Sequence, residues 1–98
     1  MLVKNDVQPD GIREVTFTLS PEIDAQTACL CGDFNDWDET LHPMKRVEDG
    51  SFSLTIKLQA GQQYQFRYFV DQSRWENDWA ADSYIANPFG SDNSVVQV

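Results

Sequence analysis

The sequence is poor in basic residues and contains no long apolar run. It has 7 lysines and arginines against 16 aspartates and glutamates, which gives a formal net charge of −9 at pH 7. Nucleic acids and anionic membrane surfaces are therefore disfavoured as partners, because binding to phosphates needs cationic side chains. No stretch is long enough to span a bilayer, and the first residues lack the apolar segment of a signal peptide. These absences predict a cytoplasmic protein.

Histidine and cysteine are also scarce, which leaves little material for a metal or catalytic centre. The only histidine, His42, precedes Pro43, and the two cysteines are spaced C-x-C within a strand-like run. Cys29 and Cys31 then point to the same face of a strand, where neighbours two residues apart rarely form a disulfide. No second cysteine pair or histidine cluster completes a zinc site. We expect two reduced cysteines and no cofactor.

An acidic segment, residues 33–39 (DFNDWDE), resembles a calcium-binding loop. An EF-hand starting at Asp33 needs Asp or Asn where Trp37 stands and Gly where Asp38 stands. Turn formation explains these residues better, and an irregular calcium site stays open as an alternative. No serine or cysteine lies in a recognisable nucleophile motif, and nothing in the spacing of the carboxylates suggests the burial that a catalytic acid needs. We therefore do not expect an enzyme.

Apolar and polar residues alternate with period two in five segments, and no helical stripe is present. The alternation predicts strands over residues 14–19, 27–34, 51–58, 63–70 and 94–98. Turn residues separate these segments, for example at Asp49 and Gly50. Short strands with regular turns in 98 residues predict a single domain, residues 1–98, folded as an all-β antiparallel sandwich.

The alternation divides the aromatic residues into two groups. Six of them fall on predicted core faces: Phe17, Phe34, Phe52, Tyr64, Phe66 and Tyr68. Four others fall in turns or irregular segments, where core packing is a weaker explanation: Trp37, Trp75, Trp79 and Phe89. All three tryptophans belong to this second group.

Exposed aromatic rings beside hydrogen-bonding side chains are suited to sugars. A pyranose presents an apolar face and a rim of hydroxyls. A protein that binds it needs a rigid aromatic ring to contact the face and forked polar side chains to bond the hydroxyls. Trp37 and Trp75 are such rings. Arg67, on the non-core face of its strand, and Asn93 are such polar groups. Residue type alone leaves two alternatives open: a protein-contact patch, and plain packing in which Trp37 covers the end of the sandwich as a lid.

Three short motifs occur in order along the chain: G-D-F-N-x-W at residues 32–37, F-R-Y-F-V-D at 66–71 and N-P-F-G-x-x-N-S-V-V at 87–96. Together they resemble the family-48 carbohydrate-binding modules. This family includes the N-terminal domains of isoamylases and glycogen branching enzymes, and the glycogen-binding domain of the AMP-activated kinase β subunit. Each motif alone is weak, and the three together are specific. The resemblance extends from Ile12 to Val98.

The resemblance implies an immunoglobulin-like, early-set β-sandwich that binds α-1,4-linked glucans without cleaving them. Glycogen, starch, maltooligosaccharides and cyclodextrin belong to this class of ligand. The family's motifs imply two stacking rings, a basic residue, an apolar residue, a hydroxyl and an amide in contact with the sugar, at Trp37, Trp75, Arg67, Phe89, Ser91 and Asn93.

Three features depart from the family pattern. Gln72 stands where Gly is usual, and the turn to Trp75 is one residue longer than in the kinase domain. Trp79 stands near a usual Pro, and it either extends the stacking platform or covers the core. Relatives attach the module to a catalytic or scaffold domain, whereas this sequence ends at Val98, so we expect a stand-alone protein or an excised domain. The alternative function is a protein-interaction domain of the same fold that docks a separate glycan-metabolising enzyme.

Overall fold

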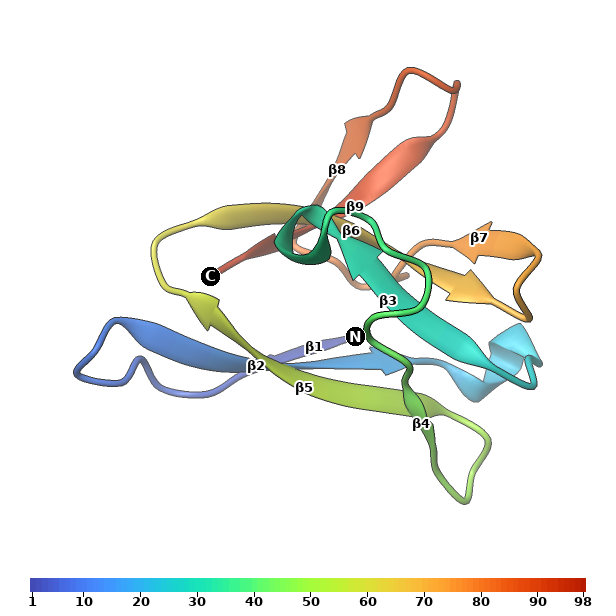
Figure 1. The fold of residues 1–98 in the computed structure, drawn as a ribbon, viewed down its shortest axis with the longest axis horizontal. Coiled ribbons are helices and arrows are strands. Elements are labelled where there is room, and N and C mark those ends of the chain that lie inside the picture. The colour runs from blue at the N-terminus through green and yellow to red at the C-terminus, as the bar shows by residue number, and fades with distance from the viewer.

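Two antiparallel β-sheets face each other in the computed structural model, which describes residues 1–98 (Figure 1). The first sheet has the strand order β1-β2-β5-β4, and the second has the order β3-β6-β9-β8, with β7 also paired to β6. The strands are β1 (Leu2–Lys4), β2 (Ile12–Leu19), β3 (Ala28–Gly32), β4 (Lys45–Arg46), β5 (Phe52–Gln59), β6 (Gln63–Val70), β7 (Arg74–Glu76), β8 (Ser83–Ala86) and β9 (Asp92–Gln97). The predicted all-β antiparallel sandwich is confirmed.

Helical structure is limited to two single turns of 3-10 helix, η1 (Pro21–Ile23) and η2 (Asp33–Asn35). The structure contains no helix with the length and apolar character needed to cross a membrane.

The pairing of β2 with β5 holds the first sheet together. All eight residues of β2 pair with β5 in continuous register. Because side chains alternate between the faces of a strand, Val15, Phe17 and Leu19 point inward, and all three are buried. On the outer face Thr16 and Thr55 lie opposite each other, with their hydroxyl oxygens 2.7 Å apart. The alternating sequence pattern therefore correctly predicts which face of this sheet is buried in the core.

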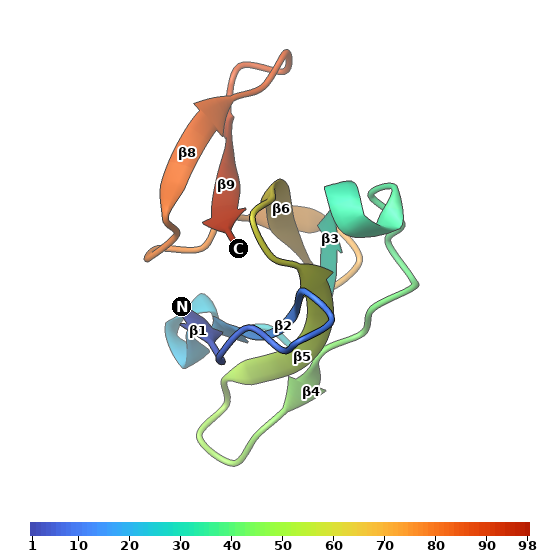
Figure 2. The same ribbon diagram turned by 90° about the vertical axis from the view of Figure 1, so that its left-hand side faces the viewer.

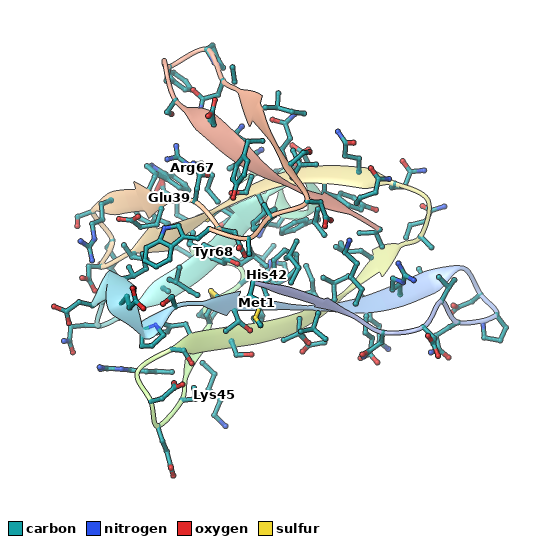
Figure 3. All side chains as sticks on the ribbon, turned by 180° about the vertical axis from the view of Figure 1, so that it is seen from behind. Met1, Glu39, His42, Lys45, Arg67 and Tyr68 are labelled. Carbon is teal, nitrogen blue, oxygen red and sulfur yellow. The ribbon has the colours of Figure 1, made fainter.

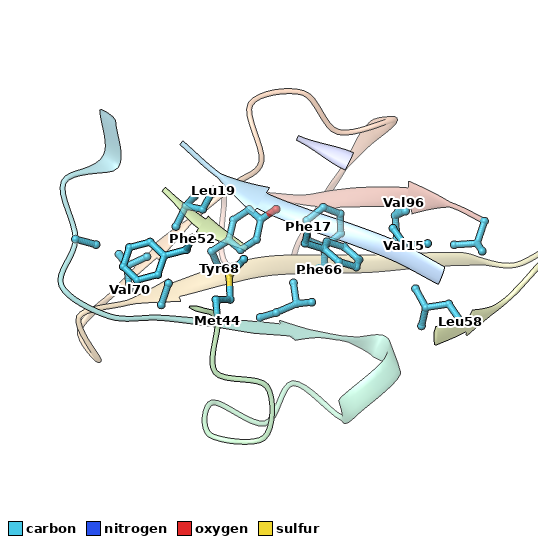
Figure 4. Close-up of a cluster of buried hydrophobic side chains, with 14 residues drawn as sticks. Val15, Phe17, Leu19, Met44, Phe52, Leu58, Phe66, Tyr68, Val70 and Val96 are labelled. Carbon is cyan, nitrogen blue, oxygen red and sulfur yellow. The ribbon is translucent and has the colours of Figure 1, made fainter. Parts of the chain in front are cut away.

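The core fills the space between the sheets and includes aromatic side chains from both (Figure 4). Phe17 of β2 packs edge-on against Phe66 of β6, with ring centroids 5.0 Å apart. Phe66 in turn contacts Tyr68, with centroids 5.7 Å apart. Phe34 and Tyr64 are partly buried and pack against this cluster. The six aromatic residues assigned to core faces all contribute to the core, as predicted.

Four short strands are missing from the sequence-based prediction: β1, β4, β7 and β8. Each has only two to four residues, too few to show an alternating pattern. All four residues of β8 are exposed, and its hairpin with β9 projects from the body of the sandwich (Figure 2). Strand β7 matters most for function, because it places Trp75 in a strand where the sequence indicates a turn or irregular segment.

A buried carboxylate connects β1 to the second sheet. Asp78 is 1% exposed, and its Oδ2 atom accepts a 2.7 Å hydrogen bond from the Tyr68 hydroxyl. The Met1 amino group lies 2.6 Å from the same oxygen, and the Ala80 N–H donates to Oδ1 at 2.8 Å. Burial, together with the neighbouring Asp78 carboxylate, raises the pKa of Tyr68 well above its usual range. The Tyr68 hydroxyl is therefore a permanent donor to Asp78 at neutral pH.

Replacing Tyr68 with Phe should lower the free energy of unfolding by about 1–3 kcal/mol, because the buried Asp78 carboxylate loses one donor. Tyr64→Phe is the matched control, since Tyr64 lies on the same face of β6 and is only partly buried. The control should change stability by less than about 0.5 kcal/mol. Urea unfolding of both variants measures the difference. Equal losses would contradict this role of the Tyr68 hydroxyl.

Candidate functional site

One buried amide side chain fixes the turn at residues 32–37. The Oδ1 atom of Asn35 accepts a 3.0 Å hydrogen bond from the Gly32 N–H, and its Nδ2 donates to the Leu30 carbonyl at 2.9 Å. The same Nδ2 lies 2.8 Å from Nδ1 of His42. Gly32 has no room for a side chain, because a Cβ atom there would lie 2.5 Å from the Gln65 carbonyl oxygen. The Gly and Asn of the first motif thus set the path of the turn.

This turn holds the Trp37 backbone in a conformation that bulky residues rarely adopt. Asp36 and Trp37 have φ angles of 56° and 59°, at a cost of roughly 1–2 kcal/mol per residue. The indole Nε1 donates to Asp33 Oδ1 at 3.1 Å, and Asp33 Oδ2 accepts from the Gln65 N–H at 2.8 Å. The Asp33 carboxylate therefore links the indole to β6. Trp37 is not among the side chains packed against the core, so its contacts do not support the lid alternative.

Strand β7 brings Trp75 to the same face of the molecule as Trp37. Trp75 lies opposite Phe69 in the pairing of β6 with β7, and their ring centroids are 4.6 Å apart. The centroids of Trp75 and Trp37 are 6.4 Å apart, with an angle of 64° between the ring planes. The β6–β7 turn has positive φ at Asp71 and Gln72, 53° and 55°. Glycine adopts such angles without strain, which explains why it is the usual residue at the position of Gln72.

Arg67 lies on the outer face of β6, as predicted, and Figure 3 labels it together with Glu39. Both side chains line one groove. Its guanidinium carbon is 6.0 Å from the centroid of the Trp75 ring, a cation–π distance. Its Nη1 atom is 3.4 Å from Ser91 Oγ, while its buried Nε has no hydrogen-bond partner. An unpaired buried N–H is unfavourable, so the fold holds Arg67 in this position at a cost in stability.

Asn87, which the sequence analysis did not name, organises the loop between β8 and β9. Its Oδ1 atom accepts hydrogen bonds from the N–H groups of Phe89 (3.0 Å) and Ser91 (3.2 Å). Its Nδ2 donates to Ser91 Oγ at 3.0 Å and to Asn93 Oδ1 at 3.1 Å. Asn93 Nδ2 then donates to Gln65 Oε1 on β6 at 3.1 Å. The available signal was the Asn-Pro pair, because Asn side chains often bond the backbone two residues ahead in turns.

These elements line an open groove of about 630 Å³, which we call the tryptophan groove. Five of the six predicted site residues line it: Trp37, Arg67, Trp75, Phe89 and Asn93. Five residues outside the prediction also line it: Asp33, Glu39, Gln65, Asn87 and Pro88. Ser91 is not among the lining residues; its hydroxyl is in hydrogen-bonding distance of Arg67 and Asn87. Trp79 lines a different groove of about 340 Å³, so it does not extend the platform.

The tryptophan groove combines flat rings with a small number of charged side chains. Its charged side chains are Arg67, Asp33 and Glu39. Beside it, hydrogen bonds from Thr40 hold the pKa of the Asp38 carboxyl below its usual value. The structure contains no group of three or more His, Cys, Asp or Glu side chains placed to hold a metal ion. Rings with donors and acceptors around them are suited to an uncharged, polyhydroxylated ligand.

Comparison with known sequences points to the same chemistry. Residues 6–89 match the family described as carbohydrate-binding module 48, the isoamylase N-terminal domain. The chain belongs to this family. Members of family 48 are immunoglobulin-like β-sandwiches. They are non-catalytic modules of glycoside hydrolase family 13 enzymes. Membership supports glucan binding as the general function of this chain.

Two bacterial enzymes named 1,4-alpha-glucan branching enzyme GlgB are similar to part of this family-48 chain. The enzyme from Photobacterium profundum is 39% identical over 57 residues, which are 57% of this chain and 7% of the enzyme. The enzyme from Aliivibrio fischeri is 35% identical over 66 residues, which are 66% of this chain and 9% of the enzyme. The match therefore spans less than a tenth of the length of these curated relatives.

The two cysteines of β3 share one face of the strand, and both thiols are free. Cys31 is fully buried, with its Sγ 3.3 Å from the Asp38 carbonyl oxygen. Burial raises the pKa of Cys31 to about 12. Burial also raises the pKa of Cys29, which is only partly covered. The two thiols therefore differ in their exposure to solvent and in their pKa values.

Alkylation with iodoacetamide near pH 8 should modify Cys29 and leave Cys31 unmodified. The thiolate is the reacting species, so a raised pKa slows the reaction, and a rise in pH should accelerate it at Cys29. Peptide mass spectrometry of the native protein measures the modification at each site. Protein unfolded in urea is the control, in which both cysteines should react. Equal reaction of both thiols in the native protein would contradict the burial of Cys31.

Proposed function

We propose that this domain binds α-1,4-linked glucan, such as glycogen, starch or maltooligosaccharides, and does not cleave it. The observation that carries the proposal is the meeting of Trp37 and Trp75, from separate segments of the sequence, in one groove with their rings 6.4 Å apart. Membership of family 48 supports a glucan as the class of ligand.

In this proposal the two indoles stack on the apolar faces of glucose units. Contact between a ring and a C–H face releases water from both surfaces, and a rigid indole loses little conformational entropy on binding. The planes of Trp37 and Trp75 are inclined at 64°. An angled surface fits an α-1,4-linked chain, which curves, better than a straight β-1,4-linked chain.

Arg67 and Asn93 supply the hydrogen bonds to sugar hydroxyls. Arg67 lines the groove, and the one hydrogen bond of its guanidinium is a 3.4 Å contact between Nη1 and Ser91 Oγ. Asn93 uses one donor for Gln65 and one lone pair for Asn87, so its amide keeps one donor and one lone pair for a ligand. Ser91 contributes through Arg67, because its hydroxyl lies 3.4 Å from the guanidinium.

Phe89 forms the outer wall of the tryptophan groove. It is 91% exposed at the end of the β8–β9 hairpin. Exposure of an apolar phenylalanine ring to water is unfavourable. Contact with the apolar edge of a sugar chain would remove part of the ring from water and so favour binding. We assign it the role of pressing on the bound glucan from the side.

The expected affinity is weak, roughly micromolar to millimolar in Kd, because an open groove must order a flexible ligand and displace water. The ligand is uncharged, so added salt should change the affinity little. We place the protein in the cytoplasm and, given its net charge of −9, expect neither nucleic acid nor membrane as a partner.

A second candidate function is the docking of a separate glycan-metabolising enzyme. The observation that favours it is a set of exposed apolar side chains on the projecting β8–β9 hairpin: Tyr84 at 46%, Ile85 at 37% and Phe89 at 91% exposure. Strand β8 is also the edge of its sheet, where backbone groups are free to pair with another chain.

Titration calorimetry with maltoheptaose tests the sugar-binding function. Trp37→Ala and Trp75→Ala should each weaken binding at least about tenfold, ~1.4 kcal/mol, because each removes one stacking surface. Trp79→Ala is the matched control, since Trp79 is 61% exposed but lines another groove. The control should bind like the wild type. Cooperative urea unfolding of each variant establishes that it is folded.

Two results would separate the candidate functions. If the wild-type protein does not bind maltoheptaose at millimolar concentration, the sugar-binding proposal is wrong and the docking function is preferred. If Trp37→Ala loses sugar binding but keeps binding to a glucan-metabolising enzyme, the two functions use separate surfaces.

A further inference from the structure

A second groove lies beside the tryptophan groove, between β3 and β6 of the second sheet and Arg46 and Phe52 of the first. It has a volume of about 600 Å³, and its lining includes Gln26, Cys29, Glu39, Arg46, Phe69 and Gln72. We call it the Phe69 groove. Glu39 lines both grooves, so they adjoin at this residue.

An apolar floor connects the two grooves. Trp75, Phe69 and Cys29 lie opposite one another across β7, β6 and β3. Neighbouring strands are about 4.8 Å apart, so this row is roughly 10 Å long. Trp75 lines the tryptophan groove, whereas Phe69 and Cys29 line the Phe69 groove. The 4.6 Å separation of the Trp75 and Phe69 ring centroids leaves no gap in the floor.

The rim of the Phe69 groove carries polar side chains that the fold leaves largely unused. The one hydrogen bond of the Arg46 guanidinium is a long contact of 3.5 Å with Gln26 Oε1. Gln72, in the turn between β6 and β7, is exposed, has a φ angle of 55° and lines the Phe69 groove. Arg46 and Glu39 bring one charge of each sign, so the lining attracts neither anions nor cations strongly. Such a rim suits the hydroxyls of a neutral chain.

We propose that the Phe69 groove holds the continuation of the same glucan chain beyond the two tryptophans. This inference rests on the glucan-binding function proposed above. The chain passes from Trp75 over Phe69 toward Cys29, with its C–H faces on the floor and its hydroxyls against Arg46 and Gln72. The domain therefore prefers linear chains that fill both grooves to short oligosaccharides that fill only the tryptophan groove.

The test compares maltotriose with maltoheptaose in calorimetric titrations of the wild type, Arg46→Ala and Gln72→Gly. Glycine is chosen at position 72 because the backbone there has φ 55°. Each variant should weaken maltoheptaose binding by about 3- to 10-fold, the loss of one hydrogen bond, and leave maltotriose binding unchanged. Lys57→Ala is the control: it removes an exposed cation from β5 of the other sheet and should affect neither ligand.

The same titrations contain the outcomes that overturn the proposal. Equal weakening of both ligands would mean that Arg46 and Gln72 act on the tryptophan groove. Unchanged binding of both ligands would mean that the chain does not enter the Phe69 groove. Failure of the wild type to bind either sugar would overturn the glucan-binding function itself, and this result is distinct from the other two.

Cys29 offers a second readout that needs no substitution. The thiol lies in the Phe69 groove, while Cys31 is buried outside it. Maltoheptaose should slow alkylation of Cys29 in proportion to the fraction of protein bound. Maltotriose should not slow it, even at a saturating concentration. Equal protection by both sugars, or by neither, would overturn the proposed path of the chain.

Discussion

The alternation of side chains along β6 is the constraint on which both the core and the tryptophan groove depend. The strand pairs with β3 on one edge and with β9 and β7 on the other. Phe66 and Tyr68 point into the core, so Arg67 and Phe69 must point outward. A shift of one residue in register would exchange these sets and place a guanidinium in the core. Burial of two aromatic rings therefore determines that Arg67 and Phe69 lie on the outer face, where they line the two grooves.

The core also stabilises local conformations that the site needs and that are unfavourable by themselves. Trp37 has a left-handed backbone, Arg67 leaves a buried N–H unpaired, and Phe89 is almost fully exposed. Each lies within the tryptophan groove. Strain and unsatisfied groups persist only where the surrounding structure holds them, here the hydrogen bonds of Asn35 and Asn87. Both amides belong to the motifs that characterise the chain, although neither was among the predicted sugar contacts.

Sheet and loops contribute differently to the two grooves. The paired strands supply a rigid floor, the row from Trp75 through Phe69 to Cys29. The side chains at the rim come from loops, as for Gln72 and Asn87, and from the short strand β4, which carries Arg46. In the proposed binding mode each further glucose unit adds contact with this floor, so we expect affinity to rise with the length of the glucan.

The sequence by itself determined the long strands, the aromatic core and the residue types of the site, because alternation, turn residues and motifs are local properties of the chain. Five of the six predicted site residues line one groove, yet the residue types alone could not show that these side chains lie close together. Only the tertiary structure decided that Trp75 stands in a strand beside Trp37, that Trp79 faces another groove, and that Asn87 orders the β8–β9 loop. The physical reason is that these outcomes depend on pairing between distant segments, and strands of three or four residues leave no periodic signal of that pairing.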